Sequence, residues 1–131
     1  MSLENLRPQY HFREVGRRIH IWDVRKLLHR AETLLVTDIP LSDIRELDEG
    51  YWFDATKQPA TCRAIGDHIK LVQAADLTYP ILLCSEGRVM DGMHRVVKAY
   101  VAGQTTITAR QFPVTPPPDF VDVSPNDLPY E

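Results

Sequence analysis

A chain of 131 residues with 44% hydrophobic and 25% charged residues has the size and composition of one globular domain that needs no metal or disulfide. Its net charge of −3 argues against a dedicated, sequence-independent DNA binder, which usually shows a strongly basic face. Cys62 and Cys84 form no CxxC pair, and no apolar run approaches membrane-spanning length or a signal-peptide core. We therefore expect a reduced, cytoplasmic protein that does not interact with membranes.

The N-terminal part predicts two strands and one helix. Residues 1 to about 20 are polar and should lie over the surface, and 19–22 could form a short strand. Asp23 has a side chain preferred at helix N-caps, and apolar residues of 24–32 fall on one helical face. The apolar run at 34–39 then predicts a second strand.

The segment after this strand combines acidic and aromatic residues. Pro40 ends the strand, and Ser42 or Asp43 could cap a short turn into Glu46. The aromatic cluster at 51–53 could pack in the core or along a cleft, and alternatively could stack on a nucleobase.

A helix is predicted from 62 to 75, with Thr61 as its N-cap. The spacing of its apolar residues places one face on Ile65, Ile69 and either Val72 or Leu71. Thr61 and Arg63 could form a small anion-binding turn, or Thr61 could simply cap the helix. His68 could face the same cleft as the motif described next, or could be an ordinary surface or core histidine. These residues are a possible part of a pocket.

The most informative stretch runs from Pro80 to Gly103. It predicts a strand, a hairpin with Glu86-Gly87 as a two-residue loop, a second strand, a bend at Asp91-Gly92 and a helix that Gly103 ends. Residues 105–112 form a final β-rich run.

The start of this last helix predicts a binding site for phosphate or another anion. A helix start offers free N–H groups and a positive dipole end, and Gly92 lets a ligand approach the backbone closely. Asp91 could cap the helix, hold a sugar hydroxyl or hold a magnesium ion, and Arg95 could grip phosphate with its planar fork. The candidate binding residues are Asp91, Gly92, Met93, His94, Arg95 and Lys98.

The alternative is a well-capped structural helix whose histidine and arginine make ordinary bonds. In either case its buried side should be formed by Val96, Val97, Tyr100 and Val101. The five histidines do not fall at zinc-ligand spacing, so no metal site of that kind is expected.

The stretch from Pro80 to Arg110 resembles the ParB/sulfiredoxin-like superfamily, and a looser resemblance begins at Leu34. It rests on the strand PILL, the turn DGMHR at 91–95, and the helix ending in Ala-x-x-x-Gly at Gly103. The sequence of this turn most resembles that of ParB-like domains that include free serine kinases. The resemblance implies an α/β (α+β) fold with a small mixed sheet and about three helices.

The family resemblance also implies a function. In that family the turn binds nucleotide phosphates, so the expected ligand is ATP or CTP with magnesium, or another phosphorylated small molecule. Met93 stands where sulfiredoxins carry the nucleophilic cysteine and partition-type ParB proteins often carry glutamate, so sulfinic acid reduction is not expected and CTP hydrolysis is in doubt. The serine kinase branch takes a catalytic glutamate from an upstream segment, and the candidates here are Glu46, Asp48 and Glu49.

Two readings of the function follow. The chain could be a phosphotransferase or nucleotidase, in which positioning and charge neutralisation supply most of the catalysis. It could instead be a non-catalytic ParB-like accessory or DNA-associated protein with a ligand-switch or vestigial pocket. No helix-turn-helix pattern follows Phe112, so sequence-specific DNA binding is not expected.

The expected organisation is a domain at 1–112 followed by a tail at 113–131, which is rich in proline and aspartate. Such a tail cannot build its own core. We expect an extended strap without helix, which lies on the domain surface or crosses to a neighbouring subunit of a homodimer.

Overall fold

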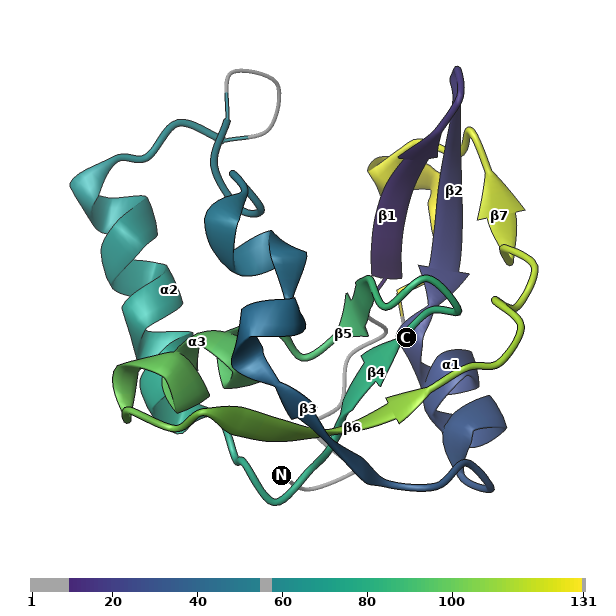
Figure 1. The fold of residues 1–131 in the computed structure, drawn as a ribbon. Helices are drawn as coiled ribbons and strands as arrows, with labels where there is room; N and C mark the ends of the chain where they lie inside the picture. Colours follow the sequence, from purple (N-terminus) through teal and green to yellow (C-terminus); the bar gives the residue numbers. More distant parts are fainter. Residues whose placement is uncertain (1–9, 55–57, 131) are drawn as a thin grey trace.

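The computed structural model describes residues 10–54 and 58–130, which form three α-helices and two small sheets (Figure 1). An antiparallel sheet has the strand order β1-β2-β7, and a mixed sheet has the order β3-β6-β4-β5. The strands are β1 (Tyr10–Val15), β2 (Arg18–Asp23), β3 (Thr37–Pro40), β4 (Ile81–Leu83), β5 (Val89–Asp91), β6 (Thr106–Gln111) and β7 (Phe120–Val121). The helices are α1 (Val24–Ala31), α2 (Cys62–Ala74) and α3 (Met93–Val101). The expected α+β class with a mixed sheet is confirmed.

Strand β4 lies inside the mixed sheet and is covered on both faces. It pairs in parallel with β6 and antiparallel with β5. Ile81 and Leu83 point to the side of α3, while Leu82 points to the side of α1, as expected for alternating side chains. The parallel β4–β6 pair requires a crossover, and β5 and α3 supply it. The start of α3 is therefore fixed directly beyond the end of β5.

The two faces of this sheet carry two separate apolar clusters. The first, on the α3 side, is formed by Leu41, Ile44, Ile81, Leu83, Val89, Met93, Val96, Ala99, Ile107 and Ala109. The second, on the α1 side, is formed by Trp22, Leu27, Ala31, Leu82, Cys84, Met90 and Phe112. Among the described residues, no helix is both long and apolar enough to cross a membrane.

The N-terminal region differs from the sequence expectation. Residues 10–15 and 18–23 pair as the β1–β2 hairpin, whereas a polar surface segment with one short strand was expected. Gly16, at φ +63°, supplies the left-handed turn residue. Asp23 does cap α1, because its side chain accepts from Arg25 N. Residues 1–9 lie outside the described part of the chain.

The predicted strand and turn between 34 and 48 also need correction. Strand β3 begins at Thr37, three residues later than predicted, and pairs antiparallel with β6. Two short 3-10 helices follow, Leu41–Asp43 and Arg45–Asp48, and neither has a side-chain cap. Ser42 and Asp43 therefore do not cap the turn that carries Glu46, because the extended residue Ile44 precedes it.

The hairpin between β4 and β5 has a three-residue loop, Ser85–Gly87, and not the predicted two-residue loop. Cys84 N donates to Arg88 O over 2.8 Å, and Gly87 N donates to Cys84 O over 2.9 Å. Gly87 has φ +81°, the left-handed conformation that closes a three-residue loop of this kind.

Helix α3 buries only part of the predicted face: Val96 is buried and Val97 packs against the core, but Tyr100 and Val101 do not. Met93, Val96 and Ala99 are buried, while Tyr100 and Val101 are 64% and 74% exposed. The buried residues recur every three positions along the helix, so Ala99, and not Tyr100, continues the face that meets the sheet. Gly103 ends the helix at φ +79° as predicted, with Gln104 N bonded to Ala99 O.

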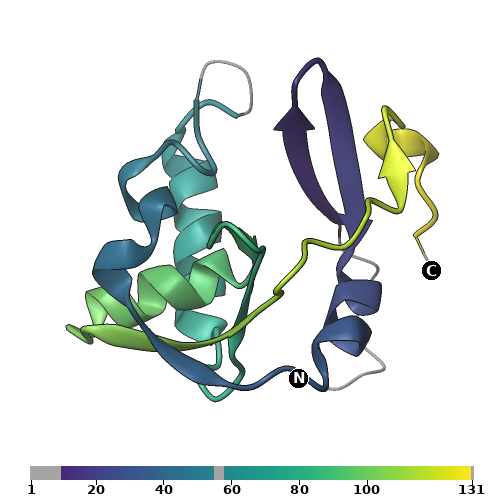
Figure 2. The ribbon, with the colours of Figure 1, turned by 45° about the vertical axis from the view of Figure 1, so that its right-hand side comes forward.

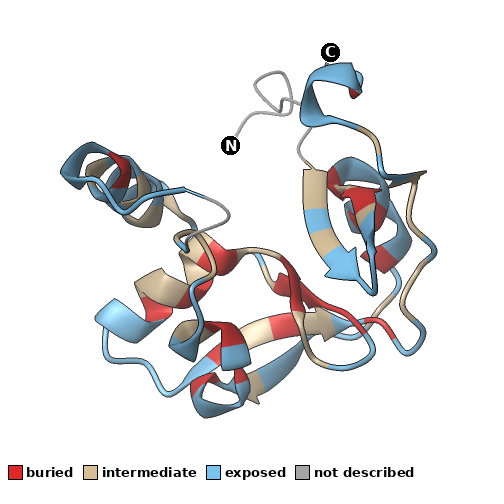
Figure 3. Ribbon diagram, turned by 90° about the horizontal axis from the view of Figure 1, so that it is seen from above, coloured by how far each residue is buried: buried red, intermediate tan, exposed pale blue. Residues whose placement is uncertain are grey.

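Helix α2 stands at the edge of the molecule and packs mainly on α3, as the view from above shows (Figure 3). Thr61 caps it as predicted, by accepting from Ala64 N. The face of α2 that packs on the domain is shifted by one residue from the predicted face. Ala64 is buried, whereas Ile65 and Ile69 are 41% and 50% exposed, because the helix turns Ala64 toward the domain.

The C-terminal tail is docked along β2 and α1 over residues 113–130 (Figure 2). Strand β7 pairs antiparallel with β2, and Leu128 is 4% exposed. A single-turn 3-10 helix at Pro125–Asp127 contradicts the expectation of a strap without helix, and Pro125 at its start suits the fixed φ of proline.

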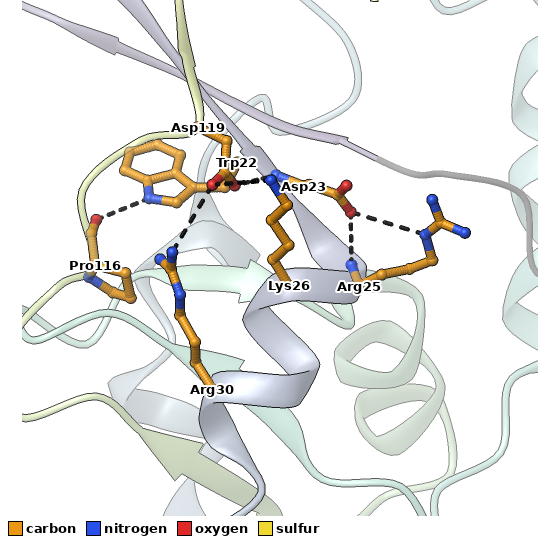
Figure 4. Close-up of polar contacts among 7 residues, drawn as sticks. All are labelled: Trp22, Asp23, Arg25, Lys26, Arg30, Pro116 and Asp119. Carbon is orange, nitrogen blue, oxygen red and sulfur yellow. Dashed lines mark hydrogen bonds and ion pairs between the residues drawn. The ribbon is translucent and has the colours of Figure 1, made fainter. Parts of the chain in front are cut away.

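Figure 4 shows two hydrogen bonds that attach the centre of this strap to β2, in addition to the main-chain bond from Asp119 N to Ile21 O. Trp22 Nε1 donates to Pro116 O over 2.8 Å, and Asp23 N donates to the Asp119 carboxylate over 2.8 Å. Lys26 and Arg30 on α1 also face this carboxylate, each at 3.9 Å.

Candidate functional site

The turn between β5 and α3 leaves the first N–H groups of the helix unused. Gly92 is the N-cap, at φ +105°, and offers no side chain to cap the helix. Within the described part of the chain, no hydrogen bond is formed by the backbone N–H of Met93, His94 or Arg95. Asp91 does not cap the helix, which was one of its possible roles. The predicted free donors at this helix start are therefore present.

A glycine is required at position 92 for a reason other than ligand approach. A Cβ atom there would lie 2.7 Å from Ile81 Cγ2 and 3.0 Å from a terminal nitrogen of Arg95. Both the positive φ and the packed neighbours exclude larger residues. The space next to the Gly92 Cα is thus filled by the protein itself, and a ligand must approach from the N–H side of the turn.

Arg95 lies at the turn, but three hydrogen bonds hold its guanidinium inside the protein. One terminal nitrogen donates to Tyr79 O over 3.0 Å and Pro80 O over 2.8 Å, and the other donates to Asp91 Oδ2 over 2.8 Å. Its side chain is 15% exposed. Arg95 therefore ties the segment before β4 to the start of α3, and its role in gripping a ligand stays a prediction.

Lys98 is held in a similar way by main-chain carbonyls. Its ammonium group donates to Gln73 O over 2.9 Å and to Ala75 O over 2.5 Å. These carbonyls lie at the end of α2, where a cation is favoured by the helix dipole. Lys98 thus joins α3 to α2 and does not point to an open anion site.

The most unusual feature of this region is a pair of hydrogen-bonded imidazoles. His68 Nδ1 on α2 and His94 Nε2 on α3 are 2.9 Å apart. The two rings lie within 21° of coplanarity, and Trp52 stacks on both, with centroid distances of 4.3 and 4.5 Å. Phe53 meets His68 edge-on at 5.2 Å. Two environments were expected for His68, and in the structure it lies beside His94 of the motif.

The surroundings of both imidazoles favour the neutral form and lower their pKa values. Partial burial, and then His68, lower the pKa of His94 to about 4. Burial also lowers the pKa of His68, although Asp67 opposes this shift. Because the two rings compete for one added proton, they should titrate as a unit.

The three upstream carboxylates occupy different environments. Glu46 is buried, its Oε2 accepts from Val89 N over 2.8 Å, and its Oε1 has no hydrogen-bond partner among the described residues. Both carboxylate oxygens of Glu49 accept hydrogen bonds from Arg88, over 2.7 and 2.8 Å. These bonds raise the pKa of Arg88. Asp48 is exposed. Only Glu46 has a buried carboxylate oxygen available beside β5.

Tyr51 connects Glu46 to the motif. Burial first, and then the carboxylates of Glu46 and Asp91, raise the pKa of Tyr51 to about 12. Both carboxylates therefore act on the same hydroxyl group. Tyr51 also meets Trp52 edge-on at 6.3 Å, so the acidic and imidazole parts of the site adjoin each other.

The possible pocket residues at the start of α2 are only partly brought to the site. Thr61 Oγ1 accepts from Ala64 N over 3.1 Å, which is ordinary capping, and Arg63 is exposed. A hollow of about 620 Å³ lies beside this helix start and is lined by Phe53, Asp54, Gln58, Pro59 and Ala60. Phe53 thus lies between this hollow and His68.

Trp52 is the functional candidate that sequence reasoning did not assign to the site individually. Its signal was the aromatic cluster at 51–53, but contact with two histidines from different helices appears only in three dimensions. Among the described residues, no group of three or more His, Cys, Asp and Glu side chains could hold a metal ion. Comparisons with protein-family models, curated proteins and solved structures find no match for this chain.

Proposed function

We propose that this chain binds a phosphate-bearing small molecule of the nucleotide class at the start of α3, beside His68 and His94. One observation carries the proposal: unused backbone N–H groups at a helix start lie next to a partly buried imidazole pair. Backbone donors and the helix dipole favour an anion there. Trp52, which supports both rings, also excludes water from one of their faces.

A reaction at this site would be phosphoryl transfer or nucleotide hydrolysis. The Asp91 carboxylate is a hard oxygen ligand of the kind that Mg²⁺ takes together with substrate phosphates and water. The metal would neutralise phosphate charge during transfer. Glu46 would accept the proton of the attacking hydroxyl or water, and the helix N–H groups would orient the phosphate.

A second candidate is a non-catalytic protein with a ligand-switch or vestigial pocket. The bonds of Arg95 and Lys98 to main-chain carbonyls favour it, because the two permanent cations of the motif are already engaged. Nucleotide binding without turnover would support this function over the catalytic one.

The test is isothermal titration with ATP and CTP, with and without Mg²⁺, on the wild type and on His94→Ala. We expect binding that weakens by about tenfold or more in the variant, the scale of a charge-assisted hydrogen bond. His29→Ala, on the exposed face of α1, is the matched control and should bind like the wild type. No binding at millimolar nucleotide, or equal affinities in all three proteins, would contradict the proposal.

The variant Glu46→Gln distinguishes the catalytic function from the non-catalytic binding function. The amide can still accept from Val89 N and keeps the fold, but it cannot take a proton. Loss of turnover with retained nucleotide binding would support catalysis. Absence of turnover in the wild type, across a panel of phosphoryl acceptors that includes water and free serine, would leave the binding function alone.

A further inference from the structure

The exposed side of α1 carries basic side chains around a surface hollow. The hollow has a volume of about 430 Å³ and is lined by Asp23, Arg25, Lys26, His29 and Arg30. The four basic side chains are between 41% and 82% exposed. The carboxylates that face the three permanent cations, Asp23 and the strap residue Asp119, are only 13% and 8% exposed. This surface therefore presents mainly positive charge to the solvent.

The three permanent cations of this surface are only loosely paired within the protein. Arg25 Nε lies 4.0 Å from Asp23 Oδ1, while Lys26 and Arg30 share one oxygen, Asp119 Oδ1, each at 3.9 Å (Figure 4). A charge-assisted hydrogen bond is shorter, about 2.7–2.9 Å. Across residues 10–54 and 58–130, none of these three side chains donates a hydrogen bond. Their donors are thus available to a partner, unlike those of the two permanent cations in the α3 motif.

The position of these cations on the helix is electrostatically unfavourable. Arg25 and Lys26 lie in the first turn of α1, which contains no acidic residue, and the positive end of a helix dipole disfavours cations there. Lys26 and Arg30 are four residues apart, a spacing at which like charges repel each other. The N-cap carboxylate of Asp23 offsets only part of this repulsion. A bound anionic partner would relieve the remainder.

The chain itself shows which kind of anion fits this surface. Residues 10–31 contain six lysine and arginine residues and two acidic ones, whereas the strap at 113–131 contains four acidic residues and no basic one. Asp122 of the strap pairs with Arg18 at 2.9 Å, and Asp119 faces the α1 cations. This half of the molecule thus already binds an extended acidic peptide, its own strap. Of the described strap carboxylates, only Asp119 is paired with the cations of α1.

The spacing of the cations suits a further extended peptide. Side chains four residues apart on a helix are separated by about 6 Å along its axis. In an extended peptide, carboxylates at alternate positions point to the same side and are about 6.5–7 Å apart. Such a peptide can therefore contact both turns of α1. A long nucleic-acid strand is less suitable, because the net charge of −3 on the whole chain opposes a large polyanion.

We propose that the exposed side of α1 is a docking surface for an extended acidic segment of a partner protein, whose carboxylates bind Arg25, Lys26 and Arg30. This goes beyond the proposed function, because the ligand contains no phosphate. The surface also lies on the α1 side of the mixed sheet, away from the face that α3 covers. Either proposal can therefore fail without the other.

The probe is an acetylated and amidated peptide of four Asp-Ser repeats, added to the full chain and followed by amide chemical shifts at pH 7. We expect saturable shifts centred on α1 and an affinity that falls as NaCl is added. The triple variant Arg25→Gln/Lys26→Gln/Arg30→Gln should bind about tenfold more weakly, because three exposed charge pairs are lost. The single variant Arg25→Gln leaves both contacts of Asp119 in place and should bind about threefold more weakly.

The matched control is Arg17→Gln/Arg63→Gln/Lys70→Gln, which removes the same charge from exposed positions outside α1. It should bind within about twofold of the wild type, since only long-range attraction changes. Equal loss in the two triple variants, or shifts centred outside α1, would overturn the proposal. An equal affinity for the neutral Asn-Ser repeat peptide would do the same. Tighter binding of pentathymidylate, which has as many negative charges as the acidic peptide, would overturn the choice of a peptide partner.

Discussion

Replacing Asp119 by Ala should loosen the centre of the strap and lower the stability of the whole domain. The carboxylate is 8% exposed and accepts a hydrogen bond from Asp23 N at 2.8 Å (Figure 4). A hydrogen bond to a charged group contributes about 1.5–3 kcal/mol. The ion pairs with Lys26 and Arg30 span 3.9 Å, and both cations are well exposed, so each adds about 0–1 kcal/mol.

The expected loss is therefore about 2–4 kcal/mol for Asp119→Ala and about 1–2 kcal/mol for Asp119→Asn, which keeps an acceptor oxygen. For a domain of this size, that corresponds to a melting temperature lower by roughly 6–15 °C for the alanine variant. Thermal melts measured with and without 1 M NaCl should show nearly the same difference, because salt screens only the smaller ion-pair part.

Asp127→Ala is the matched control, since Asp127 is an exposed acidic residue on the same strap. It should melt within about 1 °C of the wild type, as expected for a surface change. If Asp119→Ala melts like the control, the Asp23–Asp119 hydrogen bond does not hold the strap and the reasoning is refuted.

Three further predictions concern the turn, the hairpin and the strap. Gly92→Ala should cost more than about 2 kcal/mol in urea unfolding, because its Cβ would meet Ile81 at 2.7 Å, whereas Gly16→Ala, with open space around it, should cost about 1 kcal/mol. Burial first, and then nearby Arg13, lower the pKa of His11 to about 4, below its unfolded value of about 6.5, so its contribution to stability is complete above pH 6.5 and is lost as the pH falls toward 4. His11→Phe should remove about 3 kcal/mol of this acid sensitivity in urea titrations between pH 7 and 4, and an unchanged pH profile would contradict the assignment. Leu128→Ala should destabilise by about 2–4 kcal/mol if the strap stays docked in solution, and a change below 0.5 kcal/mol would show that it does not.

Local sequence signals predicted the helix boundaries well, because caps act within a few residues. Asp23 and Thr61 each accept from a backbone N–H two or three residues later, and the left-handed Gly103 ends α3. The strands of the motif followed from the apolar run of β4, which is covered on both faces. These features do not depend on distant parts of the chain.

The environment of the candidate site depended on contacts that sequence cannot provide. Arg95 has the planar fork suited to phosphate, but carbonyls of a segment fifteen and sixteen residues earlier take up its donors. The pairing of His68 with His94 depends on how α2 docks on α3. The β1–β2 hairpin was missed because its polar strand lies at a sheet edge, where alternation of apolar residues is weak.

The way in which α2 is attached to the rest of the molecule determines how this helix would respond to ligand binding. Its links to α3 are a hydrogen bond between two imidazoles and a lysine on its last carbonyls, with Ala64 as its one buried residue among those described. Such a helix is held by polar contacts more than by a core, so it should open in hydrogen exchange before the sheet does. An anion bound at the start of α3, beside His94, would stabilise one of those links. Slower amide exchange in α2 would then report occupancy of a site that lies mostly on another helix.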